Sequence, residues 1–208
     1  MNIDINETQQ RGLLYAIVSR ALMKEADIEF LKLIKQDGIK EFFPNFLDWD
    51  VYKNSGDEKI IEEYLNIDFA DISLLHLIPY ETFYTRDDGM IDSGGENKAL
   101  QFYDRFDFIV EKDKARVVSP DHIGVEFEFV HKLIEAQIEA QKADDKVGIK
   151  ELMDLELEFL DQHLLKWAPI YLINVINEAQ TPFYHDVALM GLEYLLSDFE
   201  YLKEKCKN

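Results

Sequence analysis

Apolar residues recur every three or four positions along almost the whole chain, which is the spacing of one face of an α-helix. The first such stretch, ETQQRGLLYAIVSRALM, places Leu14, Ile17 and Ala21 on one side. The longest stretches with this pattern cover residues 120–143, 148–179 and 182–205. No stretch alternates apolar and polar residues between hairpin turns, so a sheet is not expected. The sequence predicts an all-α fold, a helical bundle in which residues 1–208 form a single domain.

Two features interrupt the helical pattern. Pro169 lies inside the stretch 148–179, and proline lacks an amide hydrogen and clashes with the preceding turn. The stretch is therefore expected to bend or break, near Gln162 and His163. The stretch IPYETFYTRDDGMIDSGG, residues 78–95, is expected to be an irregular loop. Loops of this length inside a compact helical protein more often serve a function than a simple connection.

The charge of the chain limits its partners. Its 42 acidic residues outnumber its 22 lysines and arginines, and the formal net charge is −20. Nucleic acid and anionic membrane surfaces would be repelled, so neither is an expected partner. A basic partner would be attracted and its encounter accelerated, although solubility alone is the more frequent reason for such a charge.

The sequence also indicates a compartment. Cys206 is the one cysteine, so no internal disulfide can form and a reducing compartment is expected. The N-terminal stretch MNIDINETQQRG lacks the basic start and apolar block of a secretory signal. No run approaches the roughly 18 apolar residues needed to cross a bilayer. A cytoplasmic location without stable membrane association is predicted.

The stretch SPDHIGVEFEF, which starts at Ser119, has the features of a helix start. Ser119 is a good N-cap, and Pro120 follows at a position where its missing N–H is harmless. Asp121 would place a negative charge at the positive end of the helix. The sequence therefore predicts a helix that begins at Pro120.

The same helix carries an unusual pair on its apolar side, where Phe129 and Leu133 lie. At about 100° per residue, His122 and Glu126 fall on that side as well, away from the charged face. A buried unpaired carboxylate is costly, so Glu126 is expected to have a partner, and His122 is available one turn earlier. The pair is therefore a candidate for function as well as for packing.

Two further patterns have a functional and a structural interpretation. Glu128 and His131 form a Glu-x-x-His arrangement, as in di-iron helical bundles, and Glu126 is close by, but the second copy that such sites need is missing. A helical di-metal enzyme is one alternative. Trp49 and Tyr52 follow three phenylalanines and either pack the edge of the core, which is favoured, or form an apolar wall for a partner.

Four stretches follow one another along the chain: IEEYLNIDF, IPYETFYTRDDG, SPDHIGVEFEFVHKL and FLDQHLLKWAPIY. In this order they resemble four motifs of the TorD/DmsD/NarJ family of redox-enzyme maturation chaperones. Asp68 and Thr82 depart from the family's usual residues. The matching positions are Glu63, Tyr64, Ile67, Pro79, Tyr80, Glu81, Tyr84, Pro120, Asp121, His122, Ile123, Glu126, Phe129, Phe159, Leu160, His163, Leu164, Trp167 and Pro169.

The resemblance implies an all-helical chaperone without catalytic activity and without a cofactor or metal of its own. Such proteins bind the N-terminal twin-arginine signal peptide, or a related segment, of a molybdenum-cofactor oxidoreductase and hold it back from export until the cofactor is inserted. A formate dehydrogenase, a sulfoxide or N-oxide reductase and a polysulfide- or nitrate-reducing enzyme are all possible clients. The peptide-binding residues that the resemblance implies are Tyr80, Glu81, Tyr84, Asp121, His122 and Glu126.

The predicted mechanism combines an acidic rim with an apolar floor. Glu81, Asp121 and Glu126 would pair with the arginines of the signal. Phe129 and Leu133 would lie under its apolar part. An alternative function is that of an acidic adaptor, which docks a folded redox-enzyme subunit without binding a signal peptide.

Overall fold

The computed structural model of the chain describes residues 3–92, 97–110 and 117–207. These residues are helical almost throughout, and within them the one β-type pairing is an isolated bridge between Tyr80 and His122. Their buried apolar side chains form one continuous core. The predicted all-α class is confirmed. No helix in the described part of the chain has the length and apolar character needed to span a membrane.

Five long helices form the body of the protein: α1 (Ile5–Met23), α10 (Ile123–Lys142), α11 (Lys146–Phe159), α12 (Leu165–Glu178) and α13 (Pro182–Cys206). The short elements are α2 (Ile28–Ile34), η1 (Lys40–Phe42), α3 (Pro44–Asp48), α4 (Asp50–Asn54), α5 (Asp57–Ile60), η2 (Ile61–Leu65), α6 (Asn66–Ala70), η3 (Asp71–Leu75), α7 (Glu81–Thr85), α8 (Lys98–Asp104) and η4 (Leu160–Leu164).

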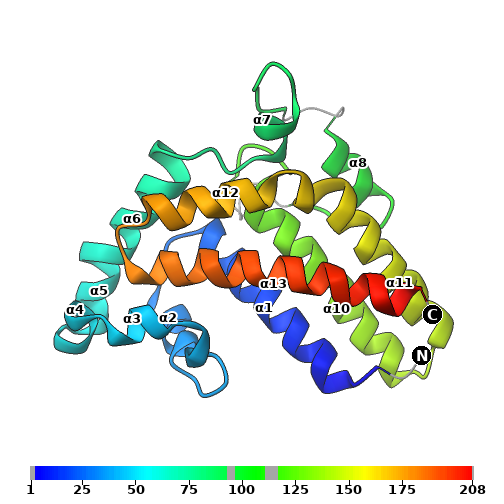
Figure 1. Cartoon of the computed structure of the whole chain (residues 1–208), viewed down its shortest axis with the longest axis horizontal. Coiled ribbons are helices and arrows are strands. Elements are labelled where there is room, and N and C mark those ends of the chain that lie inside the picture. The colour runs from blue at the N-terminus through cyan, green and yellow to red at the C-terminus, as the bar shows by residue number, and fades with distance from the viewer. Residues whose placement is uncertain (1–2, 93–96, 111–116, 208) are drawn as a thin grey trace.

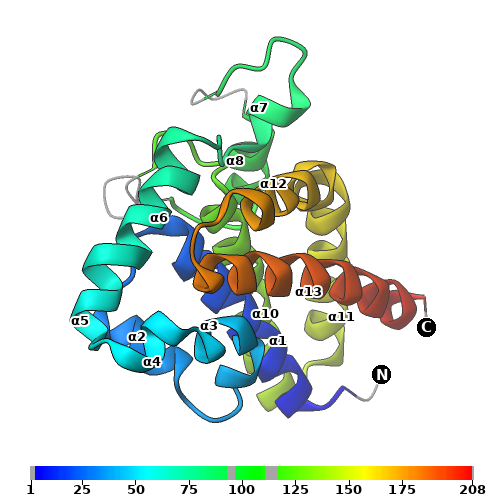
Figure 2. The same cartoon turned by 60° about the vertical axis from the view of Figure 1, so that its left-hand side comes forward.

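The long helices pack in pairs. In Figure 1, α1 lies along α10 and α12 lies along α13, while the short helices α2 to α6 gather at one end and both termini lie at the other. Figure 2 shows from a second side that α7 projects beyond α12. The segment around α7 therefore lies at the edge of the helical body, where a ligand can reach it.

Two glycines allow α1 and α10 to approach closely. A Cβ atom at Gly124 would lie 2.9 Å from Met23 Cβ and 3.1 Å from Ser19 O, and one at Gly12 would lie 3.1 Å from Ile134 Cγ2. Ser19 also donates a hydrogen bond from its hydroxyl to Gly124 O at 2.8 Å. These contacts fix the start of α10 against α1, and α10 in turn carries the residues of the predicted site.

The expected bend between residues 148 and 179 lies where the sequence predicts it. The π-helical turn η4 contains Gln162 and His163, and Figure 1 shows the helical path changing direction there, from α11 into α12. Pro169 lies inside α12, about one turn after the bend. A π-helical turn is wider than an α-helical one, which accommodates such a change of direction.

Two predicted boundaries are wrong. The helix expected from Pro120 begins at Ile123. The loop expected over residues 78–95 contains the short helix α7, and residues 93–95 of that loop lie outside the described residues. In both cases the chain makes a long-range contact instead of following its local preference, as the site geometry explains below.

Most aromatic residues around Trp49 belong to the core, whereas Phe42 is 41% exposed. Phe43 and Phe46 are fully buried, and the ring of Phe43 stacks on that of Phe183 with 5.6 Å between centroids. Trp49 packs edge-on against Tyr64 at 5.2 Å. The interpretation of these residues as a packed edge of the core is therefore the one that the structure supports.

Candidate peptide-binding site

The site is built on residues 79–85, which we call the anchored segment. Its backbone pairs with the residues that precede α10: Ile123 N–H donates to Pro79 O at 2.9 Å. Glu81 N–H likewise donates to Asp121 O at 3.0 Å. These bonds bring together two of the stretches that the resemblance singled out, although they lie far apart in the sequence.

Asp121 fastens the anchored segment from inside the protein. Its fully buried carboxylate accepts hydrogen bonds from the backbone N–H of Thr82 at 2.8 Å, from the Thr82 hydroxyl at 2.7 Å and from the Ser119 hydroxyl. Three donors compensate for the lost hydration of the carboxylate. The sequence predicts a negative charge from Asp121 at the positive end of the helix; the residue directly precedes the N-cap of α10, and its carboxylate holds the anchored segment.

His122 is the N-cap of α10. Its Nδ1 accepts a hydrogen bond from Gly124 N–H at 3.1 Å, and the ring of Tyr80 packs edge-on against it at 5.2 Å. Burial lowers the pKa of His122 to about 3, so the ring stays neutral and Nδ1 can accept. The prediction of Ser119 as the N-cap is wrong, because the hydroxyl of Ser119 binds the carboxylate of Asp121.

Glu126 is fully buried and has a partner that the sequence did not predict. Trp167 Nε1 donates a hydrogen bond to Glu126 Oε2 at 3.1 Å, while Oε1 is buried without a hydrogen-bond partner. Burial, and after it the charge of Glu81, raises the pKa of Glu126 well above its usual value. Burial therefore favours the neutral form of this side chain. The predicted partner, His122, is wrong because its ring caps the helix.

Glu81 is paired with a histidine from the bend. His163 Nδ1 lies 2.9 Å and 3.2 Å from the two carboxylate oxygens of Glu81, and both side chains are nearly fully buried. His163 and Trp167 are four residues apart, so one helical face supplies the partners of both Glu81 and Glu126. Neither residue is among the predicted site residues, although their spacing within the stretch FLDQHLLKWAPIY places them on one helical face.

A cavity of about 530 Å³ opens beside the anchored segment. Tyr84 forms part of its wall, with its ring stacked on Trp167 at 5.4 Å. Among the six predicted peptide-binding residues, Glu81 and Tyr84 line the cavity and the other four do not. The lining residues are Glu81, Thr82, Tyr84, Thr85, Arg86, Asp92, Lys98, Gln162 and Lys166.

The expected acidic rim is not formed. The relative exposures of Glu81, Asp121 and Glu126 are 5%, 0% and 0%. Each of these carboxylates is hydrogen-bonded inside the protein, and these internal bonds compensate for its burial. The charged side chains that do line the cavity include three cations, Arg86, Lys98 and Lys166.

The expected apolar floor is not formed either. Phe129 and Leu133 are buried, with relative exposures of 1% and 5%. Phe129 packs edge-on against Phe159 at 4.7 Å in a cluster of aromatic rings. Both residues therefore contribute to the core and do not line a groove.

The di-metal alternative is not supported by the geometry. Within the described residues, no three His, Cys, Asp or Glu side chains are placed to hold a metal ion. His131 Nδ1 lies 2.9 Å from Gly12 O, and Glu126 faces Trp167. Glu126, Glu128 and His131 consequently do not converge.

Comparison with known proteins adds an independent finding. Residues 35–171 match the protein family described as nitrate reductase delta subunit. The chain belongs to this family. The matched residues include the anchored segment, the start of α10 and the bend at η4, so membership of this family covers the site, and the resemblance to the TorD/DmsD/NarJ chaperones is confirmed.

The chain is also similar to a curated chaperone. It is 22% identical over 142 residues to the chaperone protein TorD of Vibrio atlanticus (strain LGP32), which covers 66% of this chain and 64% of that protein. The chain thus spans slightly less than two thirds of the length of this relative. No solved structure matches the chain.

Proposed function

We propose that this protein is a cytoplasmic maturation chaperone that binds the N-terminal twin-arginine signal segment of a molybdenum-cofactor oxidoreductase and holds it until the cofactor is inserted. Membership of the nitrate reductase delta subunit family and similarity to a protein named chaperone TorD support this function. The task is recognition of a cationic and apolar segment, so no catalytic residue, metal or cofactor is proposed for the chain.

The observation that carries the proposal is a set of exposed apolar side chains on η3 and α12, which we call the apolar strip. It consists of Leu74 and Leu75 on η3 and Ile170 and Ile173 on α12, with relative exposures between 46% and 71%. Large apolar side chains exposed on neighbouring elements are typical of a surface that contacts another protein. The strip can receive the apolar part of a signal segment.

The strip continues into the cavity beside the anchored segment. Lys166, Ile170 and Ile173 are separated by four and three residues and therefore share one face of α12. Lys166 lines the cavity, and the next residue, Trp167, stacks on Tyr84. An apolar segment that follows α12 would contact Tyr84 first and then the isoleucines.

Charged groups at the two ends of α12 determine the orientation of the bound segment along this helix. Lys98 and Lys166 lie at the cavity, near the N-terminal end of α12. Glu178 ends α12 with a side chain that is 52% exposed, and Asp71 lies close by, where it accepts a hydrogen bond from Gln180 Nε2 at 2.6 Å. The C-terminal end of a helix also carries partial negative charge. The arginines of the signal are therefore assigned to the end with Asp71 and Glu178.

The six predicted residues receive two different roles in this proposal. Tyr84 contacts the ligand from the cavity wall, and Glu81, whose carboxylate is paired with His163, lines the same cavity. The other four position that wall. Asp121 binds Thr82 of the anchored segment, His122 caps α10 and packs against Tyr80, and Glu126 binds Trp167, on which Tyr84 stacks.

A peptide titration tests the proposal. The probe carries two adjacent arginines followed by about twelve apolar residues, and its matched form has glutamines in place of the arginines. Fluorescence anisotropy is expected to give micromolar affinity for the arginine form, about −8 kcal/mol, because the client must be released again. Replacing the arginines is expected to weaken binding roughly tenfold or more, as the loss of charge-assisted hydrogen bonds does.

A pair of variants locates the binding surface. Ile173→Asp is expected to weaken binding of the arginine peptide about tenfold to a hundredfold, because a buried apolar contact is lost. Leu196→Asp on α13 is the matched control, since Leu196 and Ile173 have the same relative exposure of 46%. Equal effects of the two substitutions would exclude the apolar strip as the site. Failure of the wild-type chain to bind the peptide would overturn the proposed function.

A second function, docking of a folded redox-enzyme subunit, is favoured by the family's description as a nitrate reductase delta subunit. The apolar strip would then contact the folded partner. Mass spectrometry of the proteins that co-purify with this chain from cells separates the two functions. A captured precursor that retains its signal segment supports chaperoning, whereas a partner without such a segment supports docking.

A further inference from the structure

Another cavity, of about 500 Å³, adjoins the cavity beside the anchored segment. It lies between α8 and the turn η4, which leads into α12. The two cavities have Lys98, Gln162 and Lys166 in common, so these three side chains lie at the boundary between them. Lys98 and Lys166 orient the bound segment in the proposed function, but no group of the client has yet been assigned to them.

The charge around this cavity is opposite to that of the whole chain. Among the described residues that line it, Lys98, Arg105 and Lys166 carry a positive charge and none carries a carboxylate. The formal net charge of the chain, by contrast, is −20. The cavity is therefore a local reversal of charge, and it attracts an anionic group.

The two lysines are available to a ligand. Lys98 and Lys166 are exposed, and neither makes an ion pair within the described part of the chain. Arg105 is instead paired with Glu158 at 3.1 Å, and its guanidinium lies over the ring of Phe102, 4.6 Å from the centroid. An anion in the cavity would consequently bind the lysines first.

The acids of the adjoining cavity do not neutralise these lysines. Asp92 Oδ2 accepts a hydrogen bond from Arg86 Nη1 at 3.0 Å, and Glu81 is paired with His163. The bond to Glu81 occupies His163 Nδ1, whereas Nε2 of the same nearly buried ring makes no hydrogen bond within the described residues. The ring lines the second cavity, so a buried polar group is available there as well.

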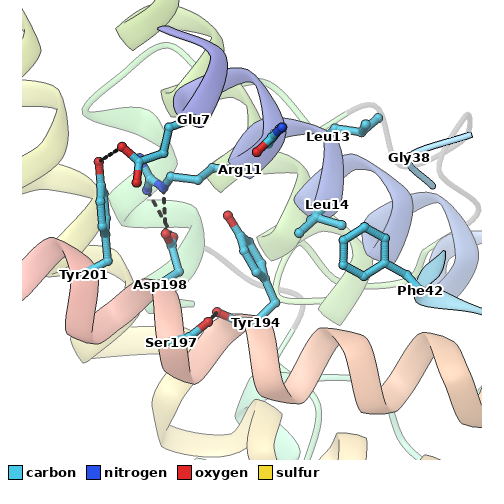
Figure 3. A pocket seen from close by; sticks show the side chains of 11 residues that line it. Glu7, Arg11, Leu13, Leu14, Gly38, Phe42, Tyr194, Ser197, Asp198 and Tyr201 are labelled. Carbon is cyan, nitrogen blue, oxygen red and sulfur yellow. Dashed lines mark hydrogen bonds and ion pairs between the residues drawn. The ribbon is translucent and has the colours of Figure 1, made fainter. Parts of the chain in front are cut away.

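The cavity between α1 and α13 provides a contrast (Figure 3). There Arg11 Nε donates to Asp198 Oδ1 at 2.6 Å, and Arg11 Nη2 donates to the buried carboxylate of Glu156. An anionic ligand would have to displace these internal bonds, and the acids would lose their donors. Lys98 and Lys166 have no such partners, so an anion can bind them without this loss.

The position of Lys166 indicates which anion reaches the lysines. Lys166 and Ile173 lie on one face of α12, seven residues or about 10 Å apart along the helix. In the proposed orientation the arginines of the signal bind at the far end of α12, the apolar part covers Ile173, and the chain then continues towards Lys166. Residues that follow the apolar part are therefore tethered near the lysines, which raises their effective concentration there.

We propose that Lys98 and Lys166 bind acidic residues of the client that directly follow the apolar part of the bound segment. The carboxylates lie at the boundary between the two cavities, where the side-chain amide of Gln162 can donate as well. This assignment rests on the proposed function and adds an acidic part to the arginine and apolar parts of the client. Such a segment is held by charge at both ends of α12.

Three peptides test the assignment by fluorescence anisotropy. Each has the arginines and the apolar part of the peptide described above, followed by two aspartates, two asparagines or two lysines. The aspartate peptide is expected to bind about three- to tenfold more tightly than the asparagine peptide, and the lysine peptide should bind most weakly. The net charge of −20 alone would produce the opposite order, so the observed order identifies a local cationic site.

Exposed lysines provide matched variants. Lys98→Gln and Lys166→Gln are each expected to reduce the advantage of the aspartate peptide over the asparagine peptide about two- to fivefold. Lys146→Gln is the control, because Lys146 is exposed, makes no ion pair within the described residues and begins α11 as Lys98 begins α8. Lys166→Glu should reverse the preference, so that the lysine peptide binds more tightly than the aspartate peptide.

Three results would overturn the assignment and leave the proposed function in place. One is binding of the aspartate peptide that is no tighter than binding of the asparagine peptide. Another is an advantage of the aspartate peptide that both glutamine variants retain in full. The third is loss of this advantage in about 1 mM inorganic phosphate but not in chloride of equal ionic strength, which would assign the lysines to a small phosphorylated ligand. Failure of all three peptides to bind would overturn the proposed function together with the assignment.

Discussion

The α1–α13 side of the protein and the anchored segment both bury several carboxylates, but they compensate for them in different ways. On the first side Arg11 lies between Asp198 and Glu156, with side-chain exposures of 5%, 2% and 0%. We call this the arginine cluster. Its guanidinium ties α1 to α11 and α13 through charged hydrogen bonds.

The second group, Glu81, Asp121 and Glu126, contains no arginine or lysine, and we call it the carboxylate cluster. Its hydrogen bonds come from backbone N–H groups, hydroxyls, an indole and an imidazole. Without an arginine or lysine, the acids are stabilised by these donors or remain protonated.

The pKa values of the acids reflect this difference. Burial raises the pKa of Glu156 to about 7, and the charge of Arg11 opposes the rise. Burial raises the pKa of Glu126 well above its usual value, and the nearby charge of Glu81 adds to the rise. Arg11 thus supplies a positive charge to the arginine cluster, whereas no arginine or lysine in the described part of the chain binds the carboxylate cluster behind the proposed site.

The largest effect is expected when the cation is removed. Arg11→Met leaves Asp198 and Glu156 buried without a positive partner, and we expect it to lower the free energy of unfolding by about 3–5 kcal/mol. Urea denaturation monitored by circular dichroism measures the loss. Arg105→Met is the control, because the ion pair of Arg105 with Glu158 at 3.1 Å is solvent-exposed and is expected to contribute less than about 1 kcal/mol. Similar losses in the two variants would contradict the role given to the arginine cluster.

In the carboxylate cluster the largest effect is expected at Asp121. Asp121→Asn replaces one acceptor oxygen by an amide group that donates, so the hydrogen bonds that Asp121 accepts from the Thr82 N–H, the Thr82 hydroxyl and the Ser119 hydroxyl cannot all persist. We expect a loss of roughly 2–3 kcal/mol in the free energy of unfolding. Amide hydrogen exchange should also show faster exchange at Thr82. An unchanged exchange rate there would show that Asp121 does not hold the anchored segment.

The capping histidine allows a third test. His122→Ala removes the N-cap of α10 and is expected to lower the free energy of unfolding by about 1–2 kcal/mol. His122→Asn keeps an acceptor for Gly124 N–H, so most of this stability should be retained. Unfolding midpoints in urea for the three proteins at pH 7 measure the difference. Equal stability of the alanine and asparagine variants would contradict the capping role.

The lowered pKa of His122 also makes the stability of the protein depend on pH. The pKa of His122 is lowered from 6.5 to about 3, so the folded state binds fewer protons than the unfolded state between these values. The stability linked to His122 is fully present above pH 6.5 and falls as the pH is lowered towards 3, by up to about 1.4 kcal/mol per pH unit. His122→Asn cannot titrate, so its stability should decline less steeply over this interval than that of the wild type.

Periodicity and motifs were sufficient for the helices and for the order of the site's parts, because both depend on local sequence. The bend at Gln162 and His163 is an example, since Pro169 marks it within the same stretch. The start of α10 is the opposite case. Ser119 and Asp121 have strong local preferences for a helix end, but their side chains bind each other, and Asp121 also binds Thr82, which is far away in the sequence.

The acidic rim could not be judged from the sequence for a related reason. Projection on a helix indicates the side on which Glu126 lies, but it does not indicate what covers that side. Trp167, 41 residues further on, covers it and supplies a hydrogen-bond donor. Burial of this kind is decided by tertiary packing, and a local pattern carries no information about it.

The smallest and most discriminating effect is expected at Glu126, which matches Asp121 in burial and in the type of substitution. Because burial already favours its neutral form, Glu126→Gln keeps the acceptor for Trp167 Nε1 and should change stability by less than about 1 kcal/mol near pH 5. The pKa of Glu126 is raised in the folded state, so the wild type loses stability as the pH rises above 4.5, where the unfolded chain ionises first. Glutamine cannot ionise, so the stability of the variant should increase relative to that of the wild type between pH 5 and 8. Urea denaturation measures this difference. If the free energy of unfolding of the variant instead falls relative to that of the wild type as the pH rises, Glu126 is stabilised as an anion. The distinction between the two clusters would then be wrong.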